Sequence, residues 1–516
     1  MCKDAPWHVY TKEKNMSSNP IKALAGQTVI YGMGTIVPRL LNYLLVPLYV
    51  RVFAAGVYGQ ITDLYAWIAF LLALLTYGME TTFFRYTQKE NPENVFNNIV
   101  SCIILTTGIF LVLYGLLYKN FAHLIQYEHN TQYVLFLGII VALDALTAVP
   151  FAKLRKNNKA KLFTIIKIAN VTLNIGLNLF FLLVIPETAL AISEKVFGPQ
   201  AGLLVWVLIS NVLSSLLSLI LLLPQFKGYH FELNKSLIRP MLAYALPILL
   251  INLVGMVNEV ADKILIKYLT PIPDADTLSA IDMTGEEYAL QQLGIYGANF
   301  KLAVLMTIFI QMFRYASEPF FFGKAKDRNA PELYAKVMTY FVIFCLLIFL
   351  GVMLYIDVLK YFVGRGGSDY HEGLVIVPIV LIANMFYGIV FNLSIWFKLT
   401  DKTFYGTIIS IIGASITLLC LFVLVPKIGY LGAAIAHLAC YTVMMLISYF
   451  WGQKHFPVPY QVGRILLYIV FAILIYIFSI TYVDYSLITK LIINTLLILV
   501  YCGTVIFFER KNPLKI

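Results

Sequence analysis

Two seven-residue stretches, Gly-Met-Glu-Thr-Thr-Phe-Phe at 78–84 and Ala-Ser-Glu-Pro-Phe-Phe-Phe at 316–322, lie 238 residues apart and share an acid and two phenylalanines. The same offset aligns Val-Tyr-Gly at 57–59 with Ile-Tyr-Gly at 295–297. Self-similarity at a fixed distance is the sequence signature of an internal repeat. The two halves of the chain are therefore predicted to share one fold.

The sequence around these stretches is too apolar for a soluble protein. Of 516 residues, 60% are hydrophobic and 13% charged, whereas a soluble domain carries about 25% charged residues. A helix needs about 20 apolar residues to cross a membrane. Fourteen runs qualify, which predicts an all-α polytopic membrane protein with about 14 transmembrane helices. The runs are 24–49, 60–84, 97–118, 131–152, 162–185, 201–223, 240–268, 293–322, 335–358, 374–398, 404–425, 428–451, 463–483 and 487–508.

The repeat unit comprises six predicted spans. An even number gives both copies the same orientation, so the repeats are predicted to be parallel and related by an axis along the membrane normal. The expected boundaries are 1–230 for an N-lobe, 231–456 for a C-lobe and 457–516 for two extra helices. An acidic segment, 270–292, is an insertion in the second copy and is predicted to be a solvated loop.

The basic residues orient the chain in the membrane. One set of alternate loops, with both terminal tails, holds 24 Lys and Arg, while the other set holds six. The positive-inside rule then predicts cytoplasmic termini. The net charge of +11 is therefore read as a topology signal and not as a nucleic-acid-binding surface. The six cysteines and seven histidines show no metal-ligand spacing, so no metal site is expected.

Several stretches resemble segments of polysaccharide-export flippases, the Wzx-like branch of the multidrug/oligosaccharidyl-lipid/polysaccharide superfamily. The similarity extends over nearly the whole chain. The stretches are 47–53, 57–59, 78–86, 261–266, 314–322 and 429–434.

The resemblance implies two MATE-like six-helix lobes around a central cavity that opens alternately to each side. It implies a cargo of polyprenyl-pyrophosphate-linked oligosaccharide, flipped from the cytoplasmic to the periplasmic leaflet of a bacterial inner membrane for O-antigen, capsule or exopolysaccharide biosynthesis. A polymerase and glycosyltransferases of the same pathway are the expected partners. No enzymatic activity and no cofactor are expected, and H+ and Na+ are the candidate coupling ions.

Charged side chains inside the spans are candidates for cargo binding, because each costs about 2.5–3.5 kcal/mol to insert and needs a partner or a task. A phosphate-binding role is predicted for five cations: Arg39, Lys167, Lys263, Lys301 and Arg314. An ion pair with another helix is an equal alternative for Arg39. Glu259 and Lys263 have the i,i+4 spacing of a self-neutralising pair, with Asp262 pointing elsewhere. Lys267 is expected to extend to the outer interface.

Polar side chains at helical spacing mark two further faces. Asn170, Asn174 and Asn178 form a stripe on the fifth predicted span, which fits either contacts to sugar hydroxyls or hydrogen bonds between helices. Gln311 is also assigned to sugar contact. It shares a face with Arg314 and Glu318, which are spaced for a local ion pair.

Four acids are predicted to act in gating or ion coupling: Glu80, Glu318, Glu259 and Asp262. Glu80 has no basic partner on its own span, so its expected partner is a Lys or Arg from a cytoplasmic loop.

Two other functions remain open from the sequence. The first is a cation-coupled multidrug exporter, although that branch usually has twelve spans and an acid in the first span, where this chain has Arg39. The second is a membrane glycosyltransferase or polymerase. This is disfavoured because the longest predicted loop, 270–292, contains no His or Arg.

Overall fold

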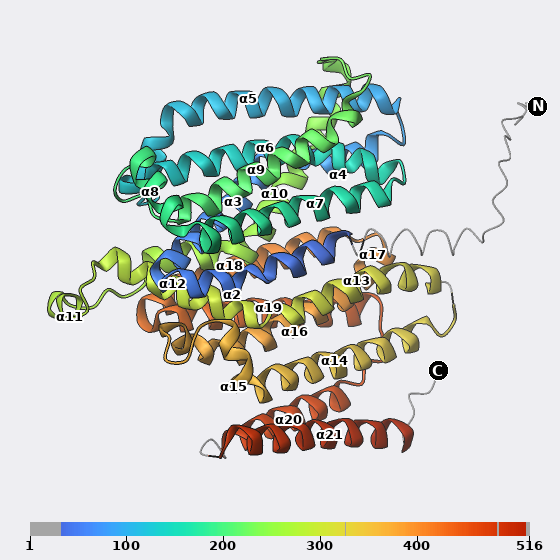
Figure 1. The fold of residues 1–516 in the computed structure, drawn as a ribbon. Coiled ribbons are helices and arrows are strands. Elements are labelled where there is room, and N and C mark those ends of the chain that lie inside the picture. Colours follow the sequence, from blue (N-terminus) through green and yellow to red (C-terminus); the bar gives the residue numbers. More distant parts are fainter. Residues whose placement is uncertain (1–31, 33, 326, 482–484, 512–516) are drawn as a thin grey trace, which may run out of the picture.

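The computed structural model describes residues 32, 34–325, 327–481 and 485–511. Every regular element in these ranges is a helix, which confirms the predicted all-helical class. Figure 1 shows long helices running side by side, with most helices of the N-terminal half above those of the C-terminal half and the last two helices at the lower edge.

The N-terminal half consists of long helices joined by short turns. After a helical stretch at 34–43, its α-helices are α2 (Leu45–Val52), α3 (Ala55–Thr76), α4 (Met79–Tyr86), α5 (Pro92–Leu124), α6 (Thr131–Lys156), α7 (Ala160–Leu179), α8 (Pro186–Phe197) and α9 (Leu204–Leu222). Its short elements are η1 (Glu128–Asn130), η2 (Phe180–Val184) and η3 (Leu223–Phe226).

The C-terminal half also consists mainly of long helices. Its α-helices are α10 (Lys235–Leu269), α11 (Ala275–Ala280), α12 (Gly285–Leu302), α13 (Val304–Lys324), α14 (Ala330–Leu354), α15 (Ile356–Leu359), α16 (Val377–Leu393), α17 (Ile395–Leu399), α18 (Phe404–Ile428), α19 (Tyr430–His455), α20 (Val462–Ile480) and α21 (Leu487–Lys511). Two 3₁₀ segments, η4 (Lys360–Phe362) and η5 (Asp369–Ile376), precede α16.

Twelve helical stretches of the described chain are long and apolar enough to cross a membrane, and the bent pair α12–α13 makes thirteen. They coincide with the predicted spans from 60–84 onward. The predicted span 293–322 is two helices that meet at a 48° bend around Ala303. The first predicted span, 24–49, lies partly outside the described residues, so the total of fourteen stays a prediction.

The main hydrophobic core takes residues from both halves, and one helix is central to the packing within each half. In the first half α6 packs against α3, α5 and α9, and in the second α19 packs against α16 and α18. Helices α20 and α21 pack on α14, away from the N-terminal half (Figure 1). The two extra helices therefore lie at the periphery, where they do not separate the two halves.

The repeated glycine motifs bring the two halves together. Helices α3 and α12 pack so closely that a Cβ atom at Gly59 would come within 1.9 Å of the Leu290 carbonyl oxygen. A Cβ at Gly294 would come within 1.8 Å of the Ala55 carbonyl oxygen. Small residues allow this close backbone approach between membrane helices. The two copies of the repeat thus contact each other directly. We name this region, where α3 and α12 begin, the crossing end.

Aromatic residues add contacts between the halves at the crossing end. The Tyr370 hydroxyl donates a hydrogen bond to the Phe53 carbonyl oxygen at 3.0 Å, and its ring packs edge-on against Tyr58. Tyr43 stacks on Phe362 with 4.4 Å between the ring centroids. These contacts, of which the one at Tyr370 is buried, close the crossing end between the two halves.

The opposite end of the molecule, where α4, α6, α13 and α17 finish, carries the basic clusters and is named the basic end. Lys153, Arg155 and Lys156 close α6, and Lys324 and Lys398 lie in the last turns of α13 and α17. In Figure 1 the crossing end is on the left and the basic end is on the right.

A glycine also explains why the predicted span 60–84 is broken. Gly78, between α3 and α4, has φ of 73°, a left-handed conformation that favours glycine. A Cβ there would lie 2.9 Å from the Ile248 side chain of α10. The helix is therefore interrupted at Gly78, and α4, with Glu80 in its first turn, packs against α6 and α10.

The acidic segment 270–292 is more ordered than the predicted loop. It contains the short helix α11 and the first turns of α12, which begins with a capping box between Thr284 and Glu287. The side chain of Asp274 accepts a hydrogen bond from the Thr277 amide, and hydrogen bonding to Thr277 holds the pKa of this exposed carboxyl below its usual value. Capping chemistry, which favours acids in a first turn, accounts for part of the acidic character.

Candidate functional site

Charges from both halves meet around one tyrosine near the middle of the molecule. The Tyr387 phenol of α16 interacts electrostatically with Arg314 of α13, Glu259 of α10 and Arg39 of the stretch 34–43. All four residues are exposed. We call these four residues the central charge cluster. The structure thus brings together Arg39 and Arg314, two of the predicted cargo-binding cations.

Arg314 is held by an aromatic ring instead of the predicted acid. Its guanidinium lies 4.8 Å from the centre of the Phe391 ring, while Glu318 pairs with Lys398 at 2.9 Å. Lys398 covers the same Phe391 ring at 4.7 Å. The predicted local pair between Arg314 and Glu318 is therefore wrong, because Glu318 forms its ion pair with Lys398 at the end of α17. The Arg314 side chain is exposed.

Glu80 contacts the kind of partner that the sequence suggested. Its carboxylate pairs with Arg155 at the end of α6, and the Arg155 guanidinium lies over the Phe84 ring. Lys167 of α7 interacts with Glu80, Arg155 and Asp144, and covers the Phe151 ring at 4.0 Å. Lys167 therefore lies in a charged group of the N-terminal half and not in the central charge cluster.

The two repeat-related acids have matching environments at the basic end. Glu80 and Glu318 each hold a cation from a later helix of their own half, Arg155 and Lys398 respectively. In both pairs the acid side chain is about two-fifths exposed. Such pairs are weakly held in water, so each cation can exchange its acid for another anion. The gating role predicted for Glu80 and Glu318 stays a prediction.

The C-terminal half buries a separate polar group. Lys263 pairs with Asp262 at 3.1 Å and donates to the backbone carbonyl of Glu259 at 2.8 Å. The Tyr296 hydroxyl donates to the other Asp262 oxygen. The predicted Glu259–Lys263 side-chain pair is wrong, and so is the prediction that Asp262 points elsewhere, because the Lys263 side chain turns toward this neighbouring acid. Glu259 remains available to the central charge cluster.

Lys301 and His437 lie beside this group. Lys301 interacts with Lys263, a like charge, and His437 interacts with Asp262 and Lys263. The His437 ring packs on Tyr441, which in turn packs on Tyr387. A line of aromatic rings therefore connects the buried Asp262 group to the central charge cluster.

Lys267 does not extend to the outer interface as predicted. Its side chain is fully buried and lies 3.7 Å from the fully buried carboxylate of Asp63 in α3. A lysine near a helix end extends to water only when its helix faces lipid there, and α10 instead packs on α3.

The asparagine stripe joins helices. Asn170 donates to the Ser214 carbonyl oxygen and the Ser218 hydroxyl of α9, at 2.7 and 2.9 Å. Asn178 accepts from the Tyr49 hydroxyl of α2 at 3.0 Å and donates to Asn174. Of the two predicted interpretations, the structure favours hydrogen bonding between helices for these residues. Gln311, half-buried on α13, stays the predicted sugar contact beside Arg314.

This assignment predicts the effect of replacing Asn170. We expect Asn170→Leu to lower the free energy of unfolding by about 1–3 kcal/mol, since the Ser214 carbonyl oxygen and the Ser218 hydroxyl lose the donor that Asn170 provides. Transport per folded molecule should stay close to that of the wild type. Thermal unfolding in detergent and transport after correction for folded protein measure the two effects. Normal stability with lost transport would instead assign Asn170 to the cargo.

Two intramembrane acids were missed in the sequence although their positions signalled them. Asp63 lies within the predicted span 60–84 and Asp144 within 131–152, and an ionisable residue inside a span is a functional candidate by default. Asp144 faces Lys167 and the Ser215 hydroxyl. Among the described residues no group of three or more His, Cys, Asp or Glu could hold a metal ion.

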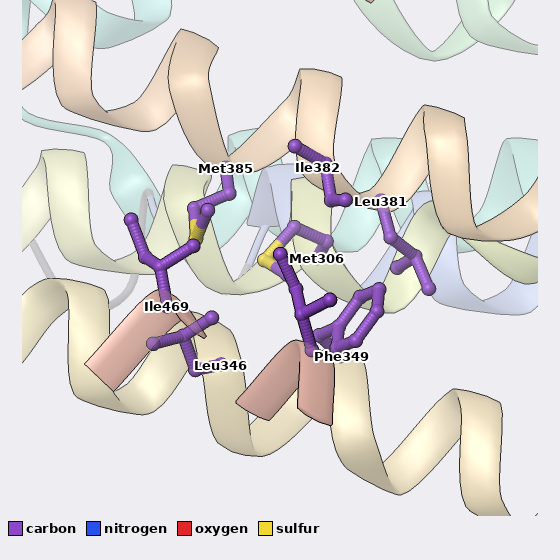
Figure 2. Close-up of a pocket in the computed structure, with 8 residues that line it drawn as sticks. Met306, Leu346, Phe349, Leu381, Ile382, Met385 and Ile469 are labelled. Carbon is purple, nitrogen blue, oxygen red and sulfur yellow. The ribbon is translucent and has the colours of Figure 1, made fainter. Parts of the chain in front are cut away.

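A small apolar gap lies within the C-terminal half, away from these charges. Figure 2 shows that it is lined by aliphatic, methionine and phenylalanine side chains of α13, α14, α16 and α20. Met306, Leu346, Phe349 and Met385 are among its walls. With no polar side chain in its lining, the gap offers nothing to a sugar or a phosphate.

A family model described as polysaccharide biosynthesis protein matches residues 24–323. A search of curated protein sequences finds no match to the chain.

Solved structures of the same fold share little sequence identity with this chain. The lipid II flippase MurJ in an inward closed conformation matches with a TM-score of 0.66 at 14% identity, over 93% of this chain and 99% of that chain. A multidrug resistance MATE family transporter in an inward-facing conformation matches with a TM-score of 0.58 at 12% identity, over 83% and 97%. A multidrug resistance MATE family transporter in an outward-facing conformation matches with a TM-score of 0.55 at 14% identity, over 85% of this chain and 96% of that chain. These similarities confirm the MATE-like fold.

Proposed function

The chain belongs to the polysaccharide biosynthesis protein family, and on that premise we propose that it flips a polyprenyl-pyrophosphate-linked oligosaccharide across a bacterial inner membrane by alternating access. The observation that carries the proposal is the central charge cluster. Arg39 and Arg314 come from the two halves of the repeat, are exposed, and both interact electrostatically with Tyr387. An anionic head group placed between the halves would meet both guanidinium groups.

The chemistry of the cargo fits this arrangement. The polyprenyl tail can stay in the lipid, whereas the sugars and the pyrophosphate need a hydrated path with positive charge. Arginine binds phosphate oxygens through two parallel hydrogen bonds, and such contacts are strong where water is partly excluded. Glu259 lies within the same cluster, and we assign to it the binding of a coupling H+ or Na+. Gln311, one turn before Arg314, would contact the sugar next to the pyrophosphate.

The orientation follows from the basic end. Cytoplasmic loops are rich in Lys and Arg, so the proposal places the basic end in the cytoplasm and the crossing end in the periplasm. With the crossing end closed, the described conformation would receive cargo from the cytoplasmic leaflet. Arg155 and Lys398, held by half-exposed acids, are the first cations that the pyrophosphate would meet.

In this proposal the flippase works between two groups of enzymes. Glycosyltransferases must complete the lipid-linked oligosaccharide on the cytoplasmic side, and a polymerase must consume it on the periplasmic side. The product would be a surface polysaccharide such as O-antigen, capsule or exopolysaccharide.

The proposal is tested with two glycolipids in vesicles that contain the purified protein. One carries the oligosaccharide on polyprenyl pyrophosphate and the other carries the same sugars without the diphosphate. We expect faster flipping of the pyrophosphate lipid and a loss of that advantage in Arg39→Ala, because the cationic pair then has only one member. Unchanged flipping by Arg39→Ala at normal protein levels would remove Arg39 from the binding site. Equal rates for both lipids would contradict a site that binds the pyrophosphate.

A further inference from the structure

A buried ion pair joins the two halves at the crossing end. Asp63 lies on α3 of the N-terminal half and Lys267 on α10 of the C-terminal half. Their side chains are both fully buried, with 3.7 Å between the carboxylate oxygen and the ammonium nitrogen. Two charges removed from water in this way stabilise only the arrangement that keeps them together.

Lys267 enters a site built by the other half. Its ammonium group donates to the carbonyl oxygen of Ile125 at 2.7 Å and lies 4.1 Å from the centre of the Tyr127 ring. The Tyr127 hydroxyl donates to Asp63 at 3.0 Å. Ile125 and Tyr127 both belong to the turn between α5 and η1. The N-terminal half thus surrounds this lysine with an acid, a carbonyl oxygen and an aromatic face.

A second acid near Lys267 belongs to the same half of the protein as the lysine. Glu286, in the first turn of α12, lies 3.9 Å from the Lys267 ammonium group and its side chain is 46% exposed. Glu286 and Lys267 both belong to the C-terminal half. When the halves separate at the crossing end, Asp63 leaves with α3 and Glu286 remains. The other polar groups facing Asp63 are Trp67 and Tyr268.

We propose that Lys267 is a latch between the halves. It is bonded to Asp63 and the turn 125–127 while the crossing end is closed, and it transfers to Glu286 when the crossing end opens. The transfer keeps the ammonium group paired in both states, which lowers the cost of opening. The latch concerns the conformational step alone, so it holds for whatever cargo the protein carries.

The latch predicts opposite effects for its two acids. Asp63→Asn removes the partner in the closed state and should raise the ratio of open to closed molecules about tenfold or more, as expected for half of a buried pair. Glu286→Gln removes the partner in the open state and should lower the same ratio. Asp276→Asn, an exposed acid of α11, is the matched control and should leave the ratio unchanged.

The ratio is measured in the full chain by distances between spin labels at Lys195→Cys and Arg365→Cys. These are exposed positions on the two halves at the crossing end, in a background without the six native cysteines. Opposite shifts for the two acids support the latch. An unchanged ratio in Asp63→Asn, or a shift toward the open state in Glu286→Gln, overturns it. If Asp63→Asn does not fold, the sign of the shift in Glu286→Gln decides alone. Failure of the glycolipid assay leaves these distances unaffected, so the two proposals fail separately.

Discussion

Replacing Arg314 by alanine should slow the flipping of a polyprenyl-pyrophosphate-linked oligosaccharide by roughly tenfold to a hundredfold, the equivalent of about 1.5–3 kcal/mol for hydrogen bonds to a charged group. Arg314 is exposed on α13 and rests on the Phe391 ring, while its nearest predicted acid, Glu318, is occupied by Lys398. In the proposed mechanism its donors bind the pyrophosphate. The measurement is the rate of flipping in reconstituted vesicles at matched amounts of folded protein.

Two variants of the same helix control this prediction. Arg314→Lys keeps the charge but loses the planar fork that binds phosphate through two hydrogen bonds, so it should fall between alanine and wild type. Lys324→Ala removes an exposed lysine at the end of α13 that pairs with Asp327, and its rate should match the wild type. A wild-type rate in Arg314→Ala would show that the central charge cluster does not bind the pyrophosphate.

Replacing Gly294 by leucine should stop transport by preventing the crossing end from closing. Even a Cβ atom at this position would lie 1.8 Å from the Ala55 carbonyl oxygen and 2.9 Å from the Gly59 nitrogen. Backbone atoms cannot give way as a flexible side chain does, so α3 and α12 must move apart. Alternating access requires both ends to close in turn, and a protein held open at one end cannot complete the cycle.

The check combines spin-label distances at positions 195 and 365 with the transport rate. We expect a longer distance and no measurable flipping in Gly294→Leu. Gly108→Leu is the matched control, because nothing lies within 4 Å of a Cβ at Gly108. A closed distance retained in Gly294→Leu would mean that the glycine contact is not what seals the crossing end.

The sequence predicted those features that depend on local composition or on the repeat. The spans from 60–84 onward follow from apolar length, and the all-helical class is confirmed. The repeated Tyr-Gly motifs were recognised from the sequence, but their place in the close packing of α3 against α12 was not predicted. Glu80 has a basic partner in Arg155, at the end of a helix. In each case the signal lies within one segment or in the comparison of two segments.

The ion-pair partners could not be predicted because they depend on how helices pack. An i,i+4 spacing places Glu259 and Lys263 on one face, yet Lys263 turns to Asp262 because Tyr296 of α12 also holds that acid there. Lys267 was expected at the surface, but α3 covers it and supplies Asp63. The asparagine stripe was correctly recognised as polar, and only the position of α9 shows that Asn170 bonds to another helix.

The most direct test of the central claim compares two cargoes in the same vesicles. A fluorescent polyprenyl-pyrophosphate-linked oligosaccharide reports flipping, and a fluorescent organic cation reports multidrug export. The account predicts that the wild-type protein flips the lipid-linked oligosaccharide, that Arg314→Ala loses this activity, and that neither protein moves the cation. Transport of the cation under an H+ or Na+ gradient, with no flipping of the oligosaccharide lipid, would contradict the account.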